Sequence, residues 1–149
     1  MKRIILAFIV AFAVAQFIRP SRANPPTDPA RSIQAHAGAS RLAAVLDRSC
    51  RDCHSNQTEW RWYTNIAPAS WLMAYAVRDG RKIVNFSEWS GYPPEQKRSL
   101  LAASCKSVSE KKMPGVYTWL RPDTKLTRQD IETICAASRQ ADALAAAGR

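Results

Sequence analysis

Two cysteines and a histidine stand close together in the first half of the chain, in the order Cys50-Arg51-Asp52-Cys53-His54. This order matches C-x-x-C-H, the pattern of covalent haem attachment. Two thiols three positions apart can each form a thioether with one vinyl group of a haem, and the adjacent imidazole can reach the iron. The sequence therefore predicts one covalently attached haem c, with His54 as an iron ligand.

Three other chemistries use closely spaced thiols and remain as alternatives. Zinc usually takes a second close pair of ligands, but Cys105 and Cys135 are far apart in the sequence and the only other histidine is His36. A disulfide or a thioredoxin-like redox pair would also use Cys50 and Cys53. A thioredoxin-like pair, however, stands at the start of a helix that follows a strand. Because this motif follows an expected helix, haem attachment is favoured.

An apolar run near the start of the chain indicates the compartment. Lys2 and Arg3 precede residues 4–18, which are apolar except for Gln16, and Arg19 closes the run. These features are typical of a signal peptide or a short membrane anchor, and we expect residues 1–23 to be one of the two. Either role would put the remaining chain on the periplasmic side of a cytoplasmic membrane, soluble after cleavage or still anchored.

The remaining residues predict one small, mainly α domain. With 46% hydrophobic and 23% charged residues the composition is that of a globular protein, and 5 Gly against 9 Pro suits helices joined by proline-rich loops. Residues 24–39 have three prolines and no apolar periodicity, so we expect a linker or extended arm. Residues 40–149 are then the haem-binding domain, with about four helices around the haem.

Apolar spacing and end signals locate those four helices. Thr127 followed by Asp130 has the pattern of an N-terminal cap, and glycine commonly ends a helix. The expected helices run from Ser40 to the cysteine motif, from Pro68 to about Arg78 with Gly80 as the stop, from Pro93 or Pro94 to near Lys111, and onward from Thr127.

Several short motifs in a fixed order carry a resemblance that covers most of the chain. They are Ile18-Arg19-Pro20, Asn24-Pro25-Pro26, Cys50 to Asn56, Trp60 to Tyr63, Ile66-Ala67-Pro68, Ser70-Trp71-Leu72, Asn85-Phe86-Ser87-Glu88-Trp89 and Met113-Pro114. In these the chain resembles the haem-binding domain family of bacterial c-type cytochrome-like proteins. Arg61 departs from the family pattern, where proline is usual. The resemblance implies a cytochrome c-like helical fold, a periplasmic domain often tethered by its N-terminus, and electron transfer.

Met113 is the expected second axial ligand of the iron. It lies in the proline-containing break Met113-Pro114-Gly115, between two expected helices, and it matches the methionine of the family motif. Met73 sits in an apolar stretch and is expected to fill the core. His36 could form a bis-histidine site if the arm folded over the haem, which is a minor alternative.

Aromatic residues after the cysteine motif are candidates for the haem surroundings. We expect aromatic side chains to line the haem edge, namely Trp60, Trp62, Tyr63, Phe86 and Trp89. The loop ending at Pro68 is expected to supply the carbonyl that orients His54.

Cys105 and Cys135 stand on the last two expected helices. In an oxidising compartment they are expected to form a disulfide with each other, and the alternative is two buried free thiols.

Two classes of function remain open from the sequence. In the first, His54 and Met113 saturate the iron and the protein carries single electrons. In the second, the sixth position is open or weakly held, and the protein is a haem peroxidase or a sensor of a small gas or of redox state. The electron carrier is favoured, because Lys111 and Lys112 are the only polar groups near Met113 that could assist catalysis, and an enzyme is less expected.

The net charge of +10 depends partly on the N-terminal end. Four of the 22 basic residues precede residue 24, which leaves 18 against 12 acidic residues and a net charge of +6. This excess is spread along the chain, which disfavours nucleic-acid binding. It suits attraction to acidic redox partner proteins or to the membrane face.

Overall fold

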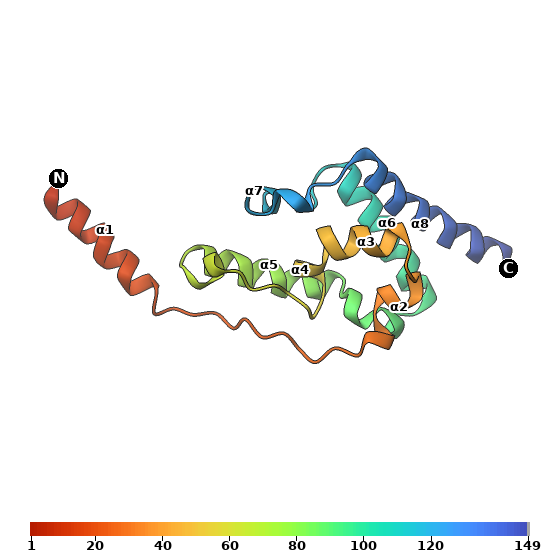
Figure 1. Ribbon diagram of the computed structural model, residues 1–149, viewed down its shortest axis with the longest axis horizontal. Coiled ribbons are helices and arrows are strands. Elements are labelled where there is room, and N and C mark those ends of the chain that lie inside the picture. Colours follow the sequence, from red (N-terminus) through yellow and green to blue (C-terminus); the bar gives the residue numbers. More distant parts are fainter. Residues whose placement is uncertain (149) are drawn as a thin grey trace.

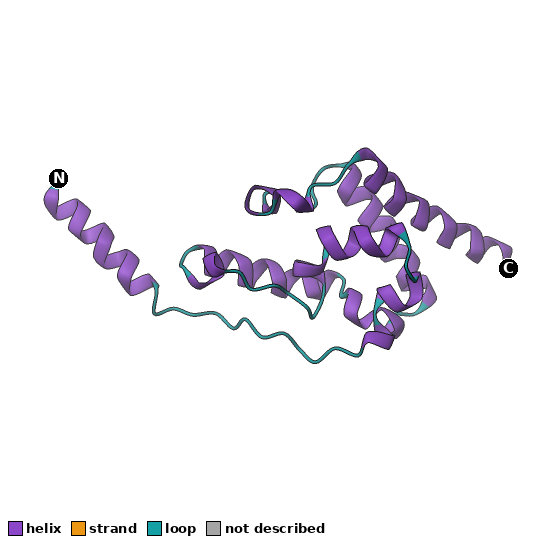
Figure 2. Ribbon diagram, in the orientation of Figure 1, coloured by secondary structure: helices purple, strands orange, loops and turns teal. Residues whose placement is uncertain are grey.

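The computed structural model describes residues 1–148, and within that range the chain folds into helices and turns with no strand (Figure 2). The prediction of a mainly α protein is confirmed. The last residue of the expected domain 40–149 lies outside this range. The α-helices are α1 (Lys2–Ala15), α2 (Ile33–Ala37), α3 (Arg41–Ser49), α4 (Arg51–His54), α5 (Ala69–Ile83), α6 (Pro94–Ser109), α7 (Tyr117–Leu120) and α8 (Arg128–Ala147). The 3-10 turns are η1 (Pro29–Arg31), η2 (Trp62–Asn65), η3 (Phe86–Gly91) and η4 (Pro122–Thr124).

The four long helices after residue 40 begin where their end signals predict. The Ser40 hydroxyl accepts a hydrogen bond from the Ala43 N–H and caps α3. Thr127 and Asp130 form a reciprocal capping box at the start of α8. Pro94 occupies the first turn of α6, where a proline costs no hydrogen bond.

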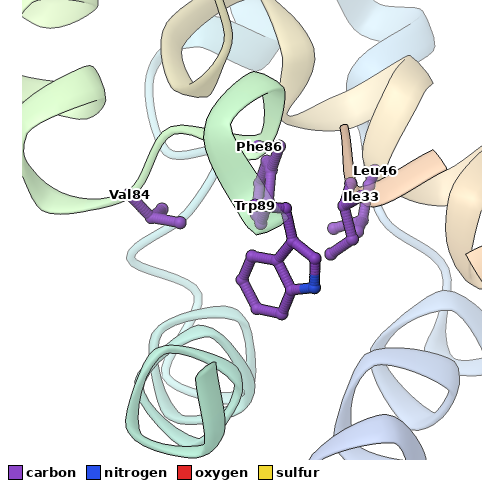
Figure 3. Packing of buried hydrophobic residues seen from close by; sticks show 5 residues of the cluster. All are labelled: Ile33, Leu46, Val84, Phe86 and Trp89. Carbon is purple, nitrogen blue, oxygen red and sulfur yellow. The ribbon is translucent and has the colours of Figure 1, made fainter. Parts of the chain in front are cut away.

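Two hydrophobic clusters join these helices. In the first, Trp89 lies between Val84 on one side and Ile33 and Leu46 on the other, with Phe86 beside it (Figure 3). The second unites α3, α6 and α8 through Val45, Val108 and Ile134. Helix α3 therefore contributes to both clusters, through Leu46 to the first and Val45 to the second. Helix α8 packs directly against it (Figure 1).

The segment after α1 runs along the domain as an extended arm (Figure 1). Its start is hydrogen-bonded to the beginning of α5, since the Ala67 N–H donates to Gln16 Oε1 at 2.9 Å and the Trp71 indole donates to the Ile18 carbonyl at 2.8 Å. Its end forms α2, where Ile33 is only 2% exposed. Residues 32–38 thus differ from a free linker, because Ser32 caps α2 and Ile33 completes the first cluster.

Every residue of α1 is exposed or partly exposed, and most of its side chains are apolar. Among residues 1–148, no helix combines the length and the apolar character that crossing a membrane requires.

The structure joins Cys105 of α6 to Cys135 of α8, with Cα atoms 4.7 Å apart. Opening this disulfide should lower the free energy of unfolding by about 3 to 4 kcal/mol, because the bridge closes a long loop in the unfolded chain. Urea unfolding of the Cys105→Ser, Cys135→Ser double variant measures the loss. Alkylation of both thiols in the unreduced wild-type protein would contradict the pairing.

Candidate functional site

A hollow of about 980 Å³, part of it open to solvent, lies between the two hydrophobic clusters. Its wall is mostly apolar, a surface that suits a large flat ring system. The residues that carry chemistry come from two places, the cysteine motif and the loop after α6. The lining residues that bear on the argument are Cys50, Cys53, His54, Phe86, Met113 and Tyr117.

Both cysteines of the motif are free thiols at the wall of the hollow. Cys50 lies at the bend between α3 and α4, and the His54 N–H donates to its carbonyl at 3.0 Å, which closes the single turn of α4. Burial raises the pKa of Cys50 to about 12 and that of Cys53 to about 11. Both side chains are therefore protonated thiols at neutral pH.

Two backbone carbonyls orient the His54 ring, one from α5 and one from the residue that follows α5. Its Nδ1 lies 3.0 Å from the Gly80 oxygen and 3.3 Å from the Val84 oxygen. Because a carbonyl can only accept, Nδ1 carries the proton and Nε2 keeps its lone pair. Burial lowers the pKa of His54 despite these hydrogen bonds, so the imidazole is neutral, the form that binds metals.

The expectation that the loop ending at Pro68 supplies this carbonyl is wrong. The Ile66 carbonyl instead accepts from Ser70 at the start of α5. The helix presents its C-terminal end to the motif, and the Gly80 carbonyl there accepts from the Val84 N–H as well as from His54.

Gly80 was expected to end its helix, which is also wrong, since α5 continues to Ile83. A Cβ added at Gly80 would lie 2.4 Å from the Cys53 carbonyl oxygen. The glycine is therefore required by the close approach of α4 to α5, the contact that brings His54 to its carbonyl partners.

Gly80→Ala should push α4 away from α5 and destabilise the fold by about 1–3 kcal/mol, the usual cost of overpacking. It should also loosen the orientation of His54. Thermal unfolding measures the first effect. Gly91→Ala is the control, because its added Cβ meets only the flexible end of Arg31, at 3.3 Å. Equal melting temperatures for the two variants would contradict the close approach.

Met113 lines the same hollow from the loop after α6 and is 45% exposed. The loop leaves the helix through Lys111, which has φ of 56°, and turns again at Gly115 with φ of 60°, where a side chain would meet the Lys112 carbonyl. Met73 is buried on α5, and His36 lies exposed on α2 with Nδ1 on the Ser32 carbonyl. Neither of these two alternatives lines the hollow.

Most of the aromatic candidates lie outside the hollow, namely Trp60, Trp62, Tyr63 and Trp89. Trp60 donates to Asn24 Oδ1 of the arm at 3.2 Å, and Trp62 is exposed with its ring edge-on to Tyr63. Pro68 is exposed at the start of α5. The ring nearest to His54 is Phe86, 6.2 Å away between centroids. Phe86 is the one aromatic residue of the expected haem edge that lines the hollow.

Arg81 fastens the arm to the segment after the motif. Its guanidinium donates to the Ser55 carbonyl, the Thr58 hydroxyl, the Ala23 carbonyl and Asn24 Oδ1, at 2.7 to 2.9 Å. With these partners it stabilises the chain around the motif, a role that its sequence position did not reveal.

A mainly helical domain in which C-x-x-C-H lines an apolar hollow is the arrangement of a haem-binding protein. The model of the haem-binding domain family matches residues 10–140, and the chain belongs to this family. No curated protein and no solved structure matches the chain significantly. The cofactor of this domain is therefore haem.

Proposed function

We propose that the protein is a monohaem c-type cytochrome of the periplasm that transfers electrons, with His54 and Met113 as the iron ligands. One observation carries this proposal. Two reduced thiols, a neutral imidazole and a thioether line a single apolar hollow. This donor set fits a haem, since the thiols suit covalent attachment, His54 offers a free Nε2, and Met113 is a soft second ligand.

Attachment uses the two thiols without any oxidant. Cys50 and Cys53 would each hold the haem through a thioether, in which the S–H has added across one vinyl double bond, so that atoms and electrons balance. Cys50 and Cys53 are three residues apart across the single turn of α4, and both line the hollow.

Haem supplies one-electron chemistry at its iron, and the protein sets whether that iron is accessible. The charged groups in the lining are already engaged, since Arg48 binds Asp130 and Asp52 binds Arg121. A peroxidase would need a free acid or base beside its open iron position. The lining thus favours an electron carrier over the second candidate, a peroxidase or sensor.

The proposed location rests on the start of the chain. Apolar residues of α1 follow Lys2 and Arg3, and the arm after α1 is hydrogen-bonded to the domain. With α1 retained as an anchor, the membrane would be one partner, and an acidic redox protein would be another, attracted by the net positive charge. Fractionation of cells tests this location, which is contradicted if the holoprotein is found in the cytoplasm.

The visible spectrum of the reduced protein, with and without carbon monoxide, tests the proposal. The protein is made together with a cytochrome maturation system. We expect a six-coordinate haem spectrum that carbon monoxide leaves nearly unchanged. A spectrum that carbon monoxide converts readily would favour the sensor or peroxidase.

A further inference from the structure

The middle of the cysteine motif contains a buried carboxylate that attachment chemistry does not use. Asp52 is 7% exposed, and both of its oxygens accept hydrogen bonds. Oδ1 accepts from the Glu59 N–H at 2.9 Å, while Oδ2 accepts from the Tyr117 hydroxyl at 2.7 Å and from Arg121 Nη1 at 3.0 Å. Two of the three donors thus come from a segment more than sixty residues away.

That distant segment carries Met113. Tyr117 begins α7, four residues after the methionine, and Arg121 follows its end. Within the segment the chain is closed by its own hydrogen bonds, because the Gly115 carbonyl accepts from the Thr118 hydroxyl at 2.9 Å and the Tyr117 carbonyl accepts from the Arg121 N–H at 2.9 Å. Hydrogen bonds that fix Tyr117 or Arg121 therefore fix the whole turn of residues 115–121.

Apolar packing does little to hold this segment. Among the described residues, α7 has no buried side chain, and its principal contacts are with the neighbouring η4. Val116 and Trp119 are 84% and 87% exposed. The Lys112 and Met113 N–H groups donate to the Ser107 carbonyl at 2.9 and 3.3 Å and fix the start of the loop to α6. Beyond them, the polar contact with Asp52 attaches residues 115–121 to the body of the domain.

The other acceptors of Arg121 cannot replace Asp52. Asp123 accepts from the same guanidinium at 2.6 Å, but it belongs to the same segment and so gives no connection to the motif. Glu59 lies 3.6 Å from Arg121, and its side chain is half exposed. Burial together with the Asp52 contact raises the pKa of Tyr117, so the phenol remains a donor at all physiological pH values.

We propose that Asp52 is a positioning residue, whose buried carboxylate binds Tyr117 and Arg121 and thereby keeps Met113 at the hollow. This inference rests on the proposed role of Met113 as an iron ligand. The second variable position of C-x-x-C-H, Asp52, then has a structural role. Helix α4 positions His54 directly and Met113 through Asp52.

Asp130 provides a matched control. It is 1% exposed and is bound by two arginines of α3, Arg41 at 3.0 Å and Arg48 at 2.8 Å. Burial alone would raise the pKa of Asp130, but hydrogen bonds from Thr127 and Arg48 keep it well below its usual range. This carboxylate is as buried and as paired as Asp52, yet it has no bond to the Met113 segment.

The experiment compares Asp52→Asn with Asp130→Asn in the haem-loaded full chain. Carbon monoxide binding to the reduced protein is timed, the ferric absorption band of sulfur bound to iron is recorded, and amide hydrogen exchange is followed over residues 115–121. Asp52→Asn should weaken the band, speed the exchange, and raise the carbon monoxide association rate by about tenfold, the scale expected for losing a charge-assisted hydrogen bond. Asp130→Asn should lower the melting temperature and leave all three readouts at wild-type values.

The outcomes separate this inference from the proposed function. A wild-type protein that lacks the band means that Met113 does not bind iron, and the proposed function fails. If the wild type shows the band and Asp52→Asn matches Asp130→Asn in all three readouts, the positioning role is overturned and the electron carrier stands. If Asp52→Asn does not accumulate, Tyr117→Phe takes its place, since it removes one donor to Asp52. Faster amide exchange over residues 115–121 and faster carbon monoxide binding in this variant support the positioning role of Asp52. Wild-type values for both refute it.

Discussion

Replacing Cys50 and Cys53 together with alanine should abolish covalent haem entirely. No other free thiol is found in the part of the chain that the structure describes, because Cys105 and Cys135 are joined. The measurement is haem peroxidase staining of a denaturing gel, on protein made with a cytochrome maturation system. The wild type should give a band at the mass of the protein and the double variant none.

Single substitutions serve as the control for this result. Cys50→Ala and Cys53→Ala each leave one thiol at the wall of the hollow, so each should retain some covalent haem, in lower yield. A wild-type protein that contains stoichiometric zinc and no haem would overturn the proposed attachment. Persistence of the full band in the double variant would do the same.

Met113→Ala should keep the covalent haem and change its chemistry. A thioether favours ferrous over ferric iron, so its loss should lower the reduction potential by a sizeable part of the roughly 0.8 V range that axial ligands set. The ferric band of sulfur bound to iron should disappear, and carbon monoxide should now bind. Potentiometry and absorption spectra of the matured variant measure these changes.

Met73→Ala is the matched control, because the two methionines differ in their surroundings. Met73 is buried on α5 and does not line the hollow. Its truncation should cost about 2–5 kcal/mol of stability and leave the spectrum and the potential nearly unchanged. If Met73→Ala opened the iron and Met113→Ala did not, the ligand assignment would be reversed.

The long helices could be predicted because their signals are local. A cap such as Ser40 or the pair Thr127 and Asp130 acts within one turn, so the residues that decide the structure are neighbours in the sequence. The C-x-x-C-H motif is equally local. The family could therefore be predicted from the sequence, and its match over residues 10–140 confirms it.

The errors all concern contacts between distant segments. Gly80 has the pattern of a helix end, yet the structure uses it for the approach of Cys53, which lies 27 positions earlier. The carbonyl partners of His54 and the donors to Asp52 likewise come from other elements. Asp52 carried a weak signal, since an acidic residue inside a motif that must face an apolar hollow needs a buried partner.

The docked arm determines where this chain can be shortened. A fragment starting at Ser40 would remove Ile33 from the first hydrophobic cluster and Asn24 from Trp60 and Arg81. It would therefore leave an apolar gap beside Trp89 and an arginine that has lost two of its four acceptors. The smallest soluble version of the domain should instead begin before Ala23, so that the arm remains a covalent part of the unit that folds.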